Sequence, residues 1–372
     1  MNKIKICYVT NSFKNCGPCN VLLSMMTGID KEKYDISLLT LLDDNDSNYV
    51  LKVKKIGINV IEFKYKKSLR TMLKKLEIVN QINNYNFDII HVHGQITAIL
   101  TDNVKAKKII TVHNKLYEDF KGLYGPIKGY IINQMYISAM KKFDKVISCS
   151  KTSYDVCSKY LKNVSFIHNG MWFEKREKTY KTEIRNKIRK KFDIPGDSIV
   201  YVFAGRYNNA KNVLTMLKYF KNCLKENEYL ISLGDGPIFE ECKAYNSKKI
   251  IQPGFVDNVT DYLMAGDIYV SFSYTEGFPV SIIEALYCGM TLLLSNIDSH
   301  IEIMEIDESF NIGSIFKNDD FESFKIKKDE VNKIKKKNDS VAFQRKYLSD
   351  IVMMKQYEKE YSYILKSESV SN

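Results

Sequence analysis

The chain has 372 residues, which is too long for one ordinary hydrophobic core and therefore predicts two domains. Hydrophobic residues make up 45% of it, enough to build large buried sheets. The formal net charge is +12, carried mostly by lysine. A balance of this size favours anionic partners: nucleotide phosphates, an anionic membrane surface or nucleic acid. The alternative is a general lysine-rich composition, since Asn and Ile are abundant too.

Targeting signals and cysteines set further limits. Residues 1–6 enter a strand directly, with no apolar region of a secretory signal, and no stretch reaches the about 18 apolar residues of a membrane span. We therefore expect a cytoplasmic protein with free thiols, whose membrane contact, if any, is peripheral. Cys16 and Cys19 form a lone C-x-x-C without the second ligand pair that zinc needs. We interpret them as incidental thiols in a tight loop, with metal or redox use as the alternative.

The first half of the chain alternates apolar strands with helices. The predicted strands span 5–10, 34–41, 60–63, 88–93, 108–113 and 145–149, and helices are predicted at 20–27 and 68–82. Continuous apolar strands that alternate with helices indicate a parallel sheet covered on both faces.

A segment dense in charge, 173–195, separates this half from a second alternating series and is predicted to be a linker with a surface helix. The later strands are predicted at 198–204, 228–233, 250–252, 268–273 and 291–295, with helices at 213–225 and 281–288. The fold class is therefore α/β, with doubly wound domains at 1–172 and 196–349. A final helical stretch, about 350–372, is a candidate to pack back onto the first domain. Ligands of such sheets bind beyond the carboxyl ends of the strands.

The most informative motif runs from Glu276 through Gly-Phe-Pro to Glu284. Pro279 suits the first helical position, and Gly289 suits the left-handed residue that follows a helix. Glu276 should then lie on the turn at the mouth of the sheet, with Glu284 about a turn and a half into the helix. The N–H groups of that helix start suit a phosphate or sugar oxygen, and the two carboxylates suit a sugar hydroxyl and a ribose diol.

Two cations follow the strand that ends at Ala204. Arg206 can hold two oxygens at once, and Lys211 acts as a movable point charge, so the pair suits a diphosphate. The alternative is an exposed pair beside a helix start. Turn 234–237 closes the next strand, where glycine permits close approach of a ligand or simply makes the turn. Loop 253–259 closes the strand after that and is a candidate to meet a nucleotide base through its backbone groups.

The first half supplies candidates of its own. Gly17 lies between the first strand and the first helix, where its backbone can approach a phosphate or donor sugar. His113 ends a strand and is placed to bond a sugar or to carry a proton. His91 and His93 share one face of another strand, and we favour a hydrogen-bonded core histidine for His91.

Together these residues resemble the family 4 retaining glycosyltransferases of the GT-B fold, from Lys3 to about Glu302. The motifs that carry the resemblance are the following: Glu276-Gly277-Phe278-Pro279 with Glu284-Ala285, Gly205-Arg206 with Lys211-Asn212, Gly234-Asp235-Gly236-Pro237, Gly254-Phe255-Val256, Gly17-Pro18, His93-Gly94, His113-Asn114 and Asn169-Gly170. The resemblance implies two Rossmann-like domains that face each other across a cleft.

By this resemblance, Arg206 and Lys211 would bind the donor diphosphate and Glu284 the ribose hydroxyls. Glu276 would orient the donor sugar, with His113 near its reacting face. The remaining donor-binding positions would be Gly17, Gly277, Phe278, Pro279, Val280 and Val256. The family's amino-terminal loop is often Gly-Gly, whereas this chain has Cys16-Gly17-Pro18.

The implied reaction moves a hexose or N-acetylhexosamine from a nucleotide diphosphate, most often uridine, to a hydroxyl of a lipid-linked or growing surface saccharide, with retention. No metal or cofactor is expected, and the acidic run 43–46 is assigned to a surface loop rather than to a metal site. A non-catalytic nucleotide-sugar-binding module is the alternative. Nucleic-acid binding is disfavoured because the basic residues are dispersed and no known module is recognisable.

A basic helix at 64–75 suggests contact with an anionic membrane. Its apolar face is predicted as Leu69, Met72, Leu73, Leu76, Val79 and Ile82, with lysines nearby. The alternative is a helix that covers its own sheet and keeps its lysines in water.

Overall fold

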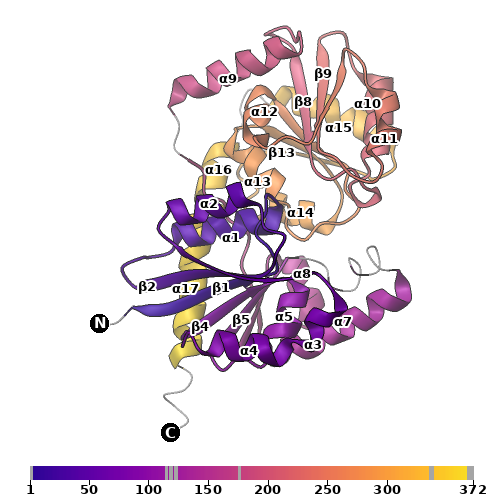
Figure 1. Cartoon of the computed structure of the whole chain (residues 1–372). Coiled ribbons are helices and arrows are strands. Elements are labelled where there is room, and N and C mark those ends of the chain that lie inside the picture. The colour runs from indigo at the N-terminus through magenta and orange to yellow at the C-terminus, as the bar shows by residue number, and fades with distance from the viewer. Residues whose placement is uncertain are drawn as a thin grey trace. The chain divides into compact units, whose positions relative to one another are not determined.

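The computed structural model describes residues 3–113, 116, 120, 125–174, 177–334 and 339–366. The chain divides into two compact units. The first unit comprises residues 1–172 together with 349–372, and the second unit comprises 173–348 (Figure 1). Both are α/β units with parallel sheets, as the alternating pattern predicted.

The first unit is built on a seven-stranded parallel sheet in the order β3-β2-β1-β4-β5-β6-β7. Its strands are β1 (Ile4–Thr10), β2 (Tyr34–Leu42), β3 (Asn59–Tyr65), β4 (Ile89–His93), β5 (Lys107–Val112), β6 (Lys145–Ser148) and β7 (Val164–Phe166). Its helices are α1 (Gly17–Gly28), α2 (Ser47–Lys55), α3 (Leu69–Leu73), α4 (Lys75–Asn83), α5 (Gln95–Thr101), α7 (Pro126–Met140), α8 (Lys151–Cys157) and α17 (Asp350–Lys366).

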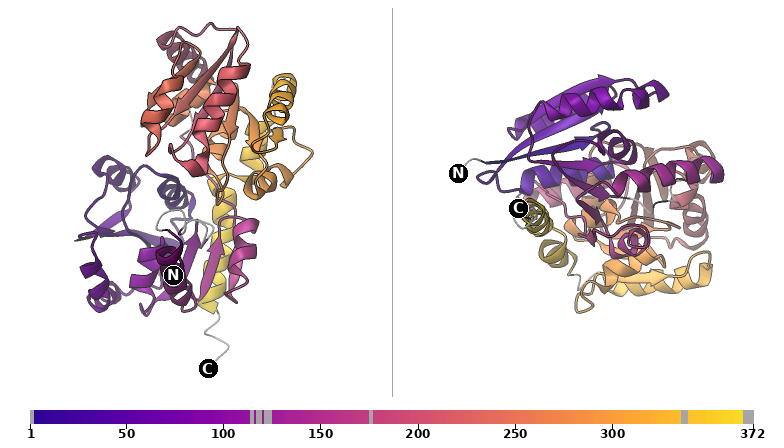
Figure 2. Two further views of the ribbon diagram at one scale, coloured as in Figure 1. Left: turned by 90° about the vertical axis from the view of Figure 1, so that its right-hand side faces the viewer. Right: turned by 90° about the horizontal axis from the view of Figure 1, so that it is seen from below.

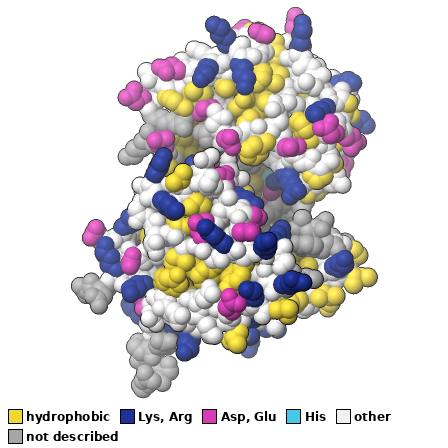
Figure 3. Space-filling model, in the orientation of Figure 1, with side chains coloured by type: hydrophobic (Ala, Val, Ile, Leu, Met, Phe, Trp, Pro, Cys, Tyr) yellow, Lys and Arg dark blue, Asp and Glu magenta, His cyan; other side chains and the backbone are white. Residues whose placement is uncertain are grey.

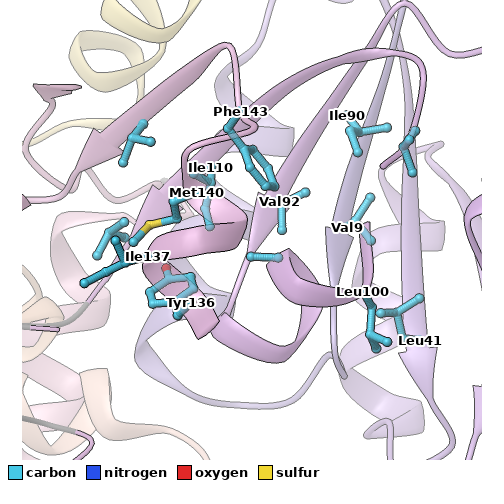
Figure 4. Packing of buried hydrophobic residues seen from close by; sticks show 14 of the residues in the cluster. Val9, Leu41, Ile90, Val92, Leu100, Ile110, Tyr136, Ile137, Met140 and Phe143 are labelled. Carbon is cyan, nitrogen blue, oxygen red and sulfur yellow. The ribbon is translucent and has the colours of Figure 1, made fainter. Parts of the chain in front are cut away.

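Figure 4 shows the core between this sheet and the helices on one of its faces. Val9, Ile90, Val92 and Ile110 project from neighbouring strands, and all four are fully buried. Burial of one such side chain contributes roughly 1.5–3 kcal/mol, which is why these strands are apolar throughout their length.

The opposite face of the sheet is covered in part by α17, the last helix among the described residues (Figures 1 and 2). A buried polar network fastens it there. His91 Nδ1 lies 2.7 Å from the hydroxyl of Tyr361, and its Nε2 lies 2.8 Å from Thr111 Oγ1. Thr111 also bonds Tyr357 at 2.9 Å, and Tyr361 bonds Tyr8 at 3.2 Å. His91 is therefore a hydrogen-bonded core histidine, as predicted.

The second unit has a six-stranded parallel sheet in the order β10-β9-β8-β11-β12-β13. Its strands are β8 (Ile199–Ala204), β9 (Glu228–Leu233), β10 (Ile250–Gly254), β11 (Ile268–Ser271), β12 (Thr291–Ser295) and β13 (Gly313–Phe316). Its helices are α9 (Lys178–Lys191), α10 (Val213–Cys223), α11 (Phe239–Cys242), α12 (Val259–Ala265), α13 (Val280–Tyr287), α14 (Asp298–Glu305), α15 (Phe321–Ile334) and α16 (Ser340–Tyr347).

Helix α9 lies in the segment that was expected to be a linker with a surface helix, and it belongs to the second unit. Arg185 and Arg189 both pair with Asp267, at 2.8 and 2.9 Å. Each also donates to the carbonyl of Ala265 at the end of α12. Because cations are favourable at a helix C-terminus, these contacts hold α9 against the body of the unit.

The predicted helix at 68–82 is wrong in one respect, because it is two helices, α3 and α4, that meet at Lys74. The break also divides the predicted apolar face. Val79 and Ile82 are buried on the sheet, whereas Leu73 and Leu76 are 87% and 73% exposed. Among the residues that the structure describes, none of the helices has the length and apolar character needed to cross a membrane.

Candidate functional site

In the second unit, the site is set by the order of its sheet. Strands β8 and β11 are neighbours, but the chain runs outward from β8 through β9 to β10 and then returns to β11 on the other side. At such a switch point the loops that follow the two strands diverge and leave room for a ligand at their carboxyl ends. These loops are 205–211 and 272–279, and a bond of 2.8 Å from the Tyr274 N–H to the Ala210 carbonyl joins them.

The two loops bring Lys211 and Glu276 together as an ion pair. The pair is largely enclosed, with side-chain exposures of 23% and 12%. Ser273 donates a second hydrogen bond, of 2.8 Å, to the same carboxylate oxygen. Burial opposes ionisation of Glu276, but the charge and hydrogen bond of Lys211 outweigh it and lower the pKa of this carboxyl. Glu276 is therefore held as a carboxylate.

Glu284 lies on α13, which begins at Val280, one residue before the predicted segment 281–288; Pro279 is its N-cap rather than its first helical residue. Gly289 follows the helix with φ +75°, as predicted. Glu284 is half-buried, and burial raises the pKa of its carboxyl to about 7. The two glutamates are thus tuned in opposite directions.

Tyr269 of β11 is influenced by the charges of both carboxylates. Its hydroxyl donates to Ser281 Oγ at 2.7 Å, in the first turn of α13. Its pKa is raised by burial first, and then by the charges of Glu276 and Glu284. Both carboxylates therefore lie near this buried hydroxyl, at the same edge of the sheet.

Arg206 lies at the other end of the loop after β8, and its side chain is exposed. Within the described ranges no acidic side chain forms an ion pair with it, so its guanidinium faces solvent. Phe278 is buried, with an exposed fraction of 4%, whereas Gly277 and Val280 are half-buried beside it. Val256 is half-buried in the loop after β10, next to the 63% exposed Phe255.

The glycine turn after β9 fits tightly under the loop after β8. Gly234 has φ +128°, and a Cβ there would lie 1.8 Å from the carbonyl oxygen of Gly205. Gly236 has φ +159°, and its Cβ would lie 2.3 Å from the carbonyl oxygen of Tyr207. Of the two readings of this turn left open by the sequence, these contacts support a packing role, which fixes the loop that carries Arg206.

One residue near the site was not predicted. His300 of α14 is fully buried, and its Nδ1 lies 2.9 Å from the carbonyl oxygen of Ser295. Its charge is among the influences that lower the pKa of Glu276. The only signal in the sequence was its place five residues after the end of a predicted strand.

In the first unit the switch point lies between β1 and β4; Gly17 comes after β1, and His113 comes after β5, the strand next to β4. Gly17 is the first residue of α1, after the N-cap Cys16. His113 follows β5, and its Nε2 lies 2.9 Å from Nδ1 of His93, the last residue of β4. Burial lowers the pKa of His113 to about 4, so the ring is neutral at physiological pH.

The environment of His93 indicates which ring carries the shared proton. His93 is 3% exposed, and none of the polar groups described bonds its Nε2. If Nδ1–H of His93 donates to His113, only an acceptor stays unpaired, which costs less than a buried, unpaired N–H. This arrangement leaves His113 protonated on Nδ1, as a hydrogen-bond donor.

The acidic run 43–46 has structural contacts. Asp46 caps α2, Asp44 pairs with Lys14 at 2.7 Å, and Asn45 accepts the N–H of Phe13. Throughout the described ranges, no cluster of three or more His, Cys, Asp or Glu side chains is arranged to hold a metal ion.

Family comparisons divide the chain much as its structure does. Residues 17–172 match the family described as Glycosyltransferase Family 4. Residues 184–345 match the family described as Glycosyl transferases group 1.

Individual relatives are distant but span most of the chain. An O-antigen biosynthesis glycosyltransferase of Escherichia coli, WclY, is 25% identical over 317 residues, which cover 81% of this chain and 83% of that protein. An Escherichia coli UDP-Gal:alpha-D-GlcNAc-diphosphoundecaprenol alpha-1,3-galactosyltransferase is 26% identical over 83% of this chain and 87% of that protein. Among solved structures, Anabaena HepE in complex with UDP-glucose matches with a TM-score of 0.78 at 14% identity, covering 97% of this chain and 100% of that one.

Proposed function

Because the chain belongs to the glycosyltransferases of the GT-B fold, we propose that it transfers a hexose or N-acetylhexosamine from a UDP-sugar to a hydroxyl of a lipid-linked or growing surface saccharide, with retention of configuration. The relatives that act in O-antigen synthesis and on a diphosphoundecaprenol-linked sugar support the acceptor class. The likeness to HepE with bound UDP-glucose supports the donor.

The single observation that carries the proposal is the Lys211–Glu276 pair at the switch point of the second sheet. Without donor, the two side chains neutralise each other. An incoming diphosphate offers Lys211 a more highly charged partner, so the ammonium group moves to the phosphate and Glu276 is released toward the sugar hydroxyls. The exposed Arg206 supplies the second cation.

The chemical step separates charge. As the bond between the anomeric carbon and the diphosphate breaks, positive charge grows on the sugar and negative charge on the leaving group. Arg206, Lys211 and the N–H groups near Phe278 at the start of α13 stabilise the leaving diphosphate. The acceptor hydroxyl attacks from the same face and gives its proton to that diphosphate, which accounts for retention. Glu276 orients the sugar, and His113 donates its Nδ1–H to a sugar oxygen.

The charge of the diphosphate is balanced by side chains in this scheme, so we expect transfer to persist in EDTA. A loss of activity in EDTA that Mg²⁺ restores would contradict the assignment of that role to Arg206 and Lys211.

We also propose that the first unit contacts an anionic membrane through α3 and the start of α4. Leu73 and Leu76 are largely exposed, and Lys66, Lys67 and Arg70 are exposed beside them in the sequence. Apolar side chains among basic ones suit an anionic lipid surface. The same area also has neighbouring acidic groups, since Lys74 pairs with Glu77 at 3.5 Å. Lysine, arginine and acidic side chains are interspersed over the face seen in Figure 3, so net charge alone does not locate such a surface.

Sedimentation with phosphatidylglycerol vesicles tests the membrane proposal. The wild type should sediment, and Leu73→Asp with Leu76→Asp should not. Both side chains are exposed, so the fold should tolerate these changes. Equal sedimentation of both proteins, or none of either, would contradict it.

Calorimetric titration with UDP tests the donor site. Arg206→Ala and Lys211→Ala should each weaken binding roughly tenfold or more, since a hydrogen bond to a charged group is worth about 1.5–3 kcal/mol. Lys218→Ala, which removes an exposed lysine of α10, is the matched control and should bind as the wild type does. Equal affinity for UDP in the wild type and all three variants would contradict the assignment of Arg206 and Lys211 to the donor site. Binding without any turnover would favour a non-catalytic nucleotide-sugar-binding module.

A further inference from the structure

Cys16 and Cys19 are placed unlike any other cysteines of this chain. All eight cysteines lie in the described part of the structure, and of these only Cys16 is exposed. It is the N-cap of the twelve-residue helix α1, and Gly17 and Pro18 form the first positions of that helix. Cys19, one turn later, is 6% exposed and directs its Sγ to the carbonyl of Ser12 at 3.6 Å.

The two cysteine side chains influence each other's ionisation. An interaction with the Cys19 side chain is the largest influence on the pKa of Cys16; burial opposes it, and the Cys19 backbone N–H and the charge of Lys14 add to it. Together they lower the pKa of Cys16 to about 7, and the same interaction raises the pKa of Cys19. An exposed thiolate at a helix N-terminus, with a buried partner three residues later, is the arrangement that makes the first cysteine of a C-x-x-C pair nucleophilic.

We propose that Cys16 and Cys19 form a redox-active dithiol whose substrate is a low-molecular-weight disulfide. This revises the interpretation of the pair as incidental thiols. The evidence is the geometry: Cys16 is an exposed residue at the N-cap of α1, Cys19 is a buried residue of the first turn, and residues i and i+3 are neighbours on the surface of a helix. A disulfide joins Cβ atoms about 3.5–4.5 Å apart, so only a small movement at the first turn of α1 is required.

The exchange has two steps. The Cys16 thiolate attacks one sulfur of the small disulfide, forms a mixed disulfide and releases one thiolate. Capping Cys16 removes its charge, which is one of the causes that hold the pKa of Cys19 high. Cys19 then loses its proton and attacks Cys16 Sγ, which forms the Cys16–Cys19 bond and releases the second thiolate. Two protein thiols are oxidised, one disulfide is reduced to two thiols, and the protons pass to the leaving thiolates.

The dithiol has a consequence for sugar transfer, and this consequence rests on the proposed function. Gly17 and Pro18 lie between the two sulfurs, and Gly17 is a proposed donor-binding residue. Oxidation ties the two ends of this turn together. We therefore expect transfer to fall severalfold when the disulfide forms and to recover with dithiothreitol.

Mass spectrometry after exposure of the full chain to glutathione disulfide tests the dithiol without reference to activity. The wild type should gain an internal Cys16–Cys19 disulfide. Cys19→Ser should stop at a mixed disulfide on Cys16, and Cys16→Ser should form neither. Cys223→Ser, which removes a half-buried cysteine of α10, should behave as the wild type. The proposal would be overturned if the wild type formed no Cys16–Cys19 disulfide. It would also be overturned if Cys16→Ser still formed an internal or mixed disulfide at another cysteine. Because Cys16 is exposed, its variant tests the idea without disturbing the core.

The pH dependence of alkylation is a second readout. A thiol with a pKa near 7 is about half ionised at pH 7, against about 3% for an ordinary cysteine, although its lower basicity makes the thiolate roughly fivefold less reactive. Cys16 should therefore be alkylated about threefold faster than an ordinary thiol, with a midpoint near pH 7; a midpoint near 8.5 would contradict the proposal.

If the disulfide forms and transfer is unchanged, the dithiol stands and its coupling to the donor loop is refuted. If no transfer occurs under any condition, the failure belongs to the proposed function.

Discussion

Glu284→Gln should remove a pH-dependent loss of stability from the second unit. Burial raises the pKa of Glu284 from 4.5 to about 7. Between these two values the native state binds the proton more tightly than the unfolded state does, so stability falls as pH rises. The cost of ionising Glu284 above pH 7 is therefore on the order of 3 kcal/mol. Between pH 5 and pH 8 the wild type should therefore lose on the order of 2–3 kcal/mol relative to the glutamine variant.

Hydrogen exchange of peptides from β11 and β12 measures this loss in the second unit alone, after correction for the pH dependence of intrinsic exchange. Glu305→Gln, at an exposed position of α14, is the matched control. A difference between Glu284→Gln and the wild type that does not change from pH 5 to pH 8 would refute the assignment of a carboxyl whose pKa is raised by burial.

Protonation of Glu284 should also weaken the binding of the donor. If the carboxylate of Glu284 accepts the ribose hydroxyls, only the ionised form binds well, and its population falls about tenfold from pH 8 to pH 6. The dissociation constant of UDP-glucose, which does not titrate in this range, should rise by about that factor. A constant that does not change with pH would contradict the role of Glu284.

Three further changes test individual contacts of the two units by their effect on stability. Lys211→Ala should cost about 2 kcal/mol in urea unfolding, because it leaves the Glu276 carboxylate without its cation, and the added change Glu276→Gln should recover most of that loss. Gly234→Ala should cost about 3 kcal/mol or more, because its Cβ would meet a backbone oxygen at 1.8 Å, whereas Gly196→Ala has open space and should be nearly neutral. Tyr361→Phe should cost about 1–3 kcal/mol, since His91 loses a buried partner; an unchanged unfolding midpoint would refute that network.

The parts of the fold that could be predicted are those in which local pattern and tertiary environment agree. Strands β8, β9 and β12 are buried on both faces, so each is a continuous apolar run whose ends are visible in the sequence. Strands β7 and β13 were not predicted. β7 has only three residues, and β13 begins with a glycine, a residue that is uncommon in strands. In the structure a Cβ at this glycine would meet Leu292 of the neighbouring strand. Their formation depends on the neighbouring strand rather than on their own composition.

The candidate site likewise has features that the sequence could predict and features that depend on the arrangement of the strands. Glu276 and Lys211 could be named from the sequence because each follows an apolar strand, but their ion pair depends on the neighbouring positions of β8 and β11 in the sheet. The contact between His93 and His113 depends likewise on the register of β4 against β5, which aligns His93 with Thr111. Sequence spacing specifies neither the order of the strands in the sheet nor the register of one strand against the next.

Donor turnover is the most direct test of the account. The purified full chain is incubated with radiolabelled UDP-glucose, UDP-galactose and UDP-N-acetylhexosamines, with and without a short lipid-linked saccharide, beside Glu276→Ala and Arg206→Ala. At least one donor should be transferred or slowly hydrolysed by the wild type, and both variants should lose most of that turnover. Turnover that survives both changes at the wild-type rate, or its absence with every donor and acceptor, would contradict the proposed glycosyl transfer at this site.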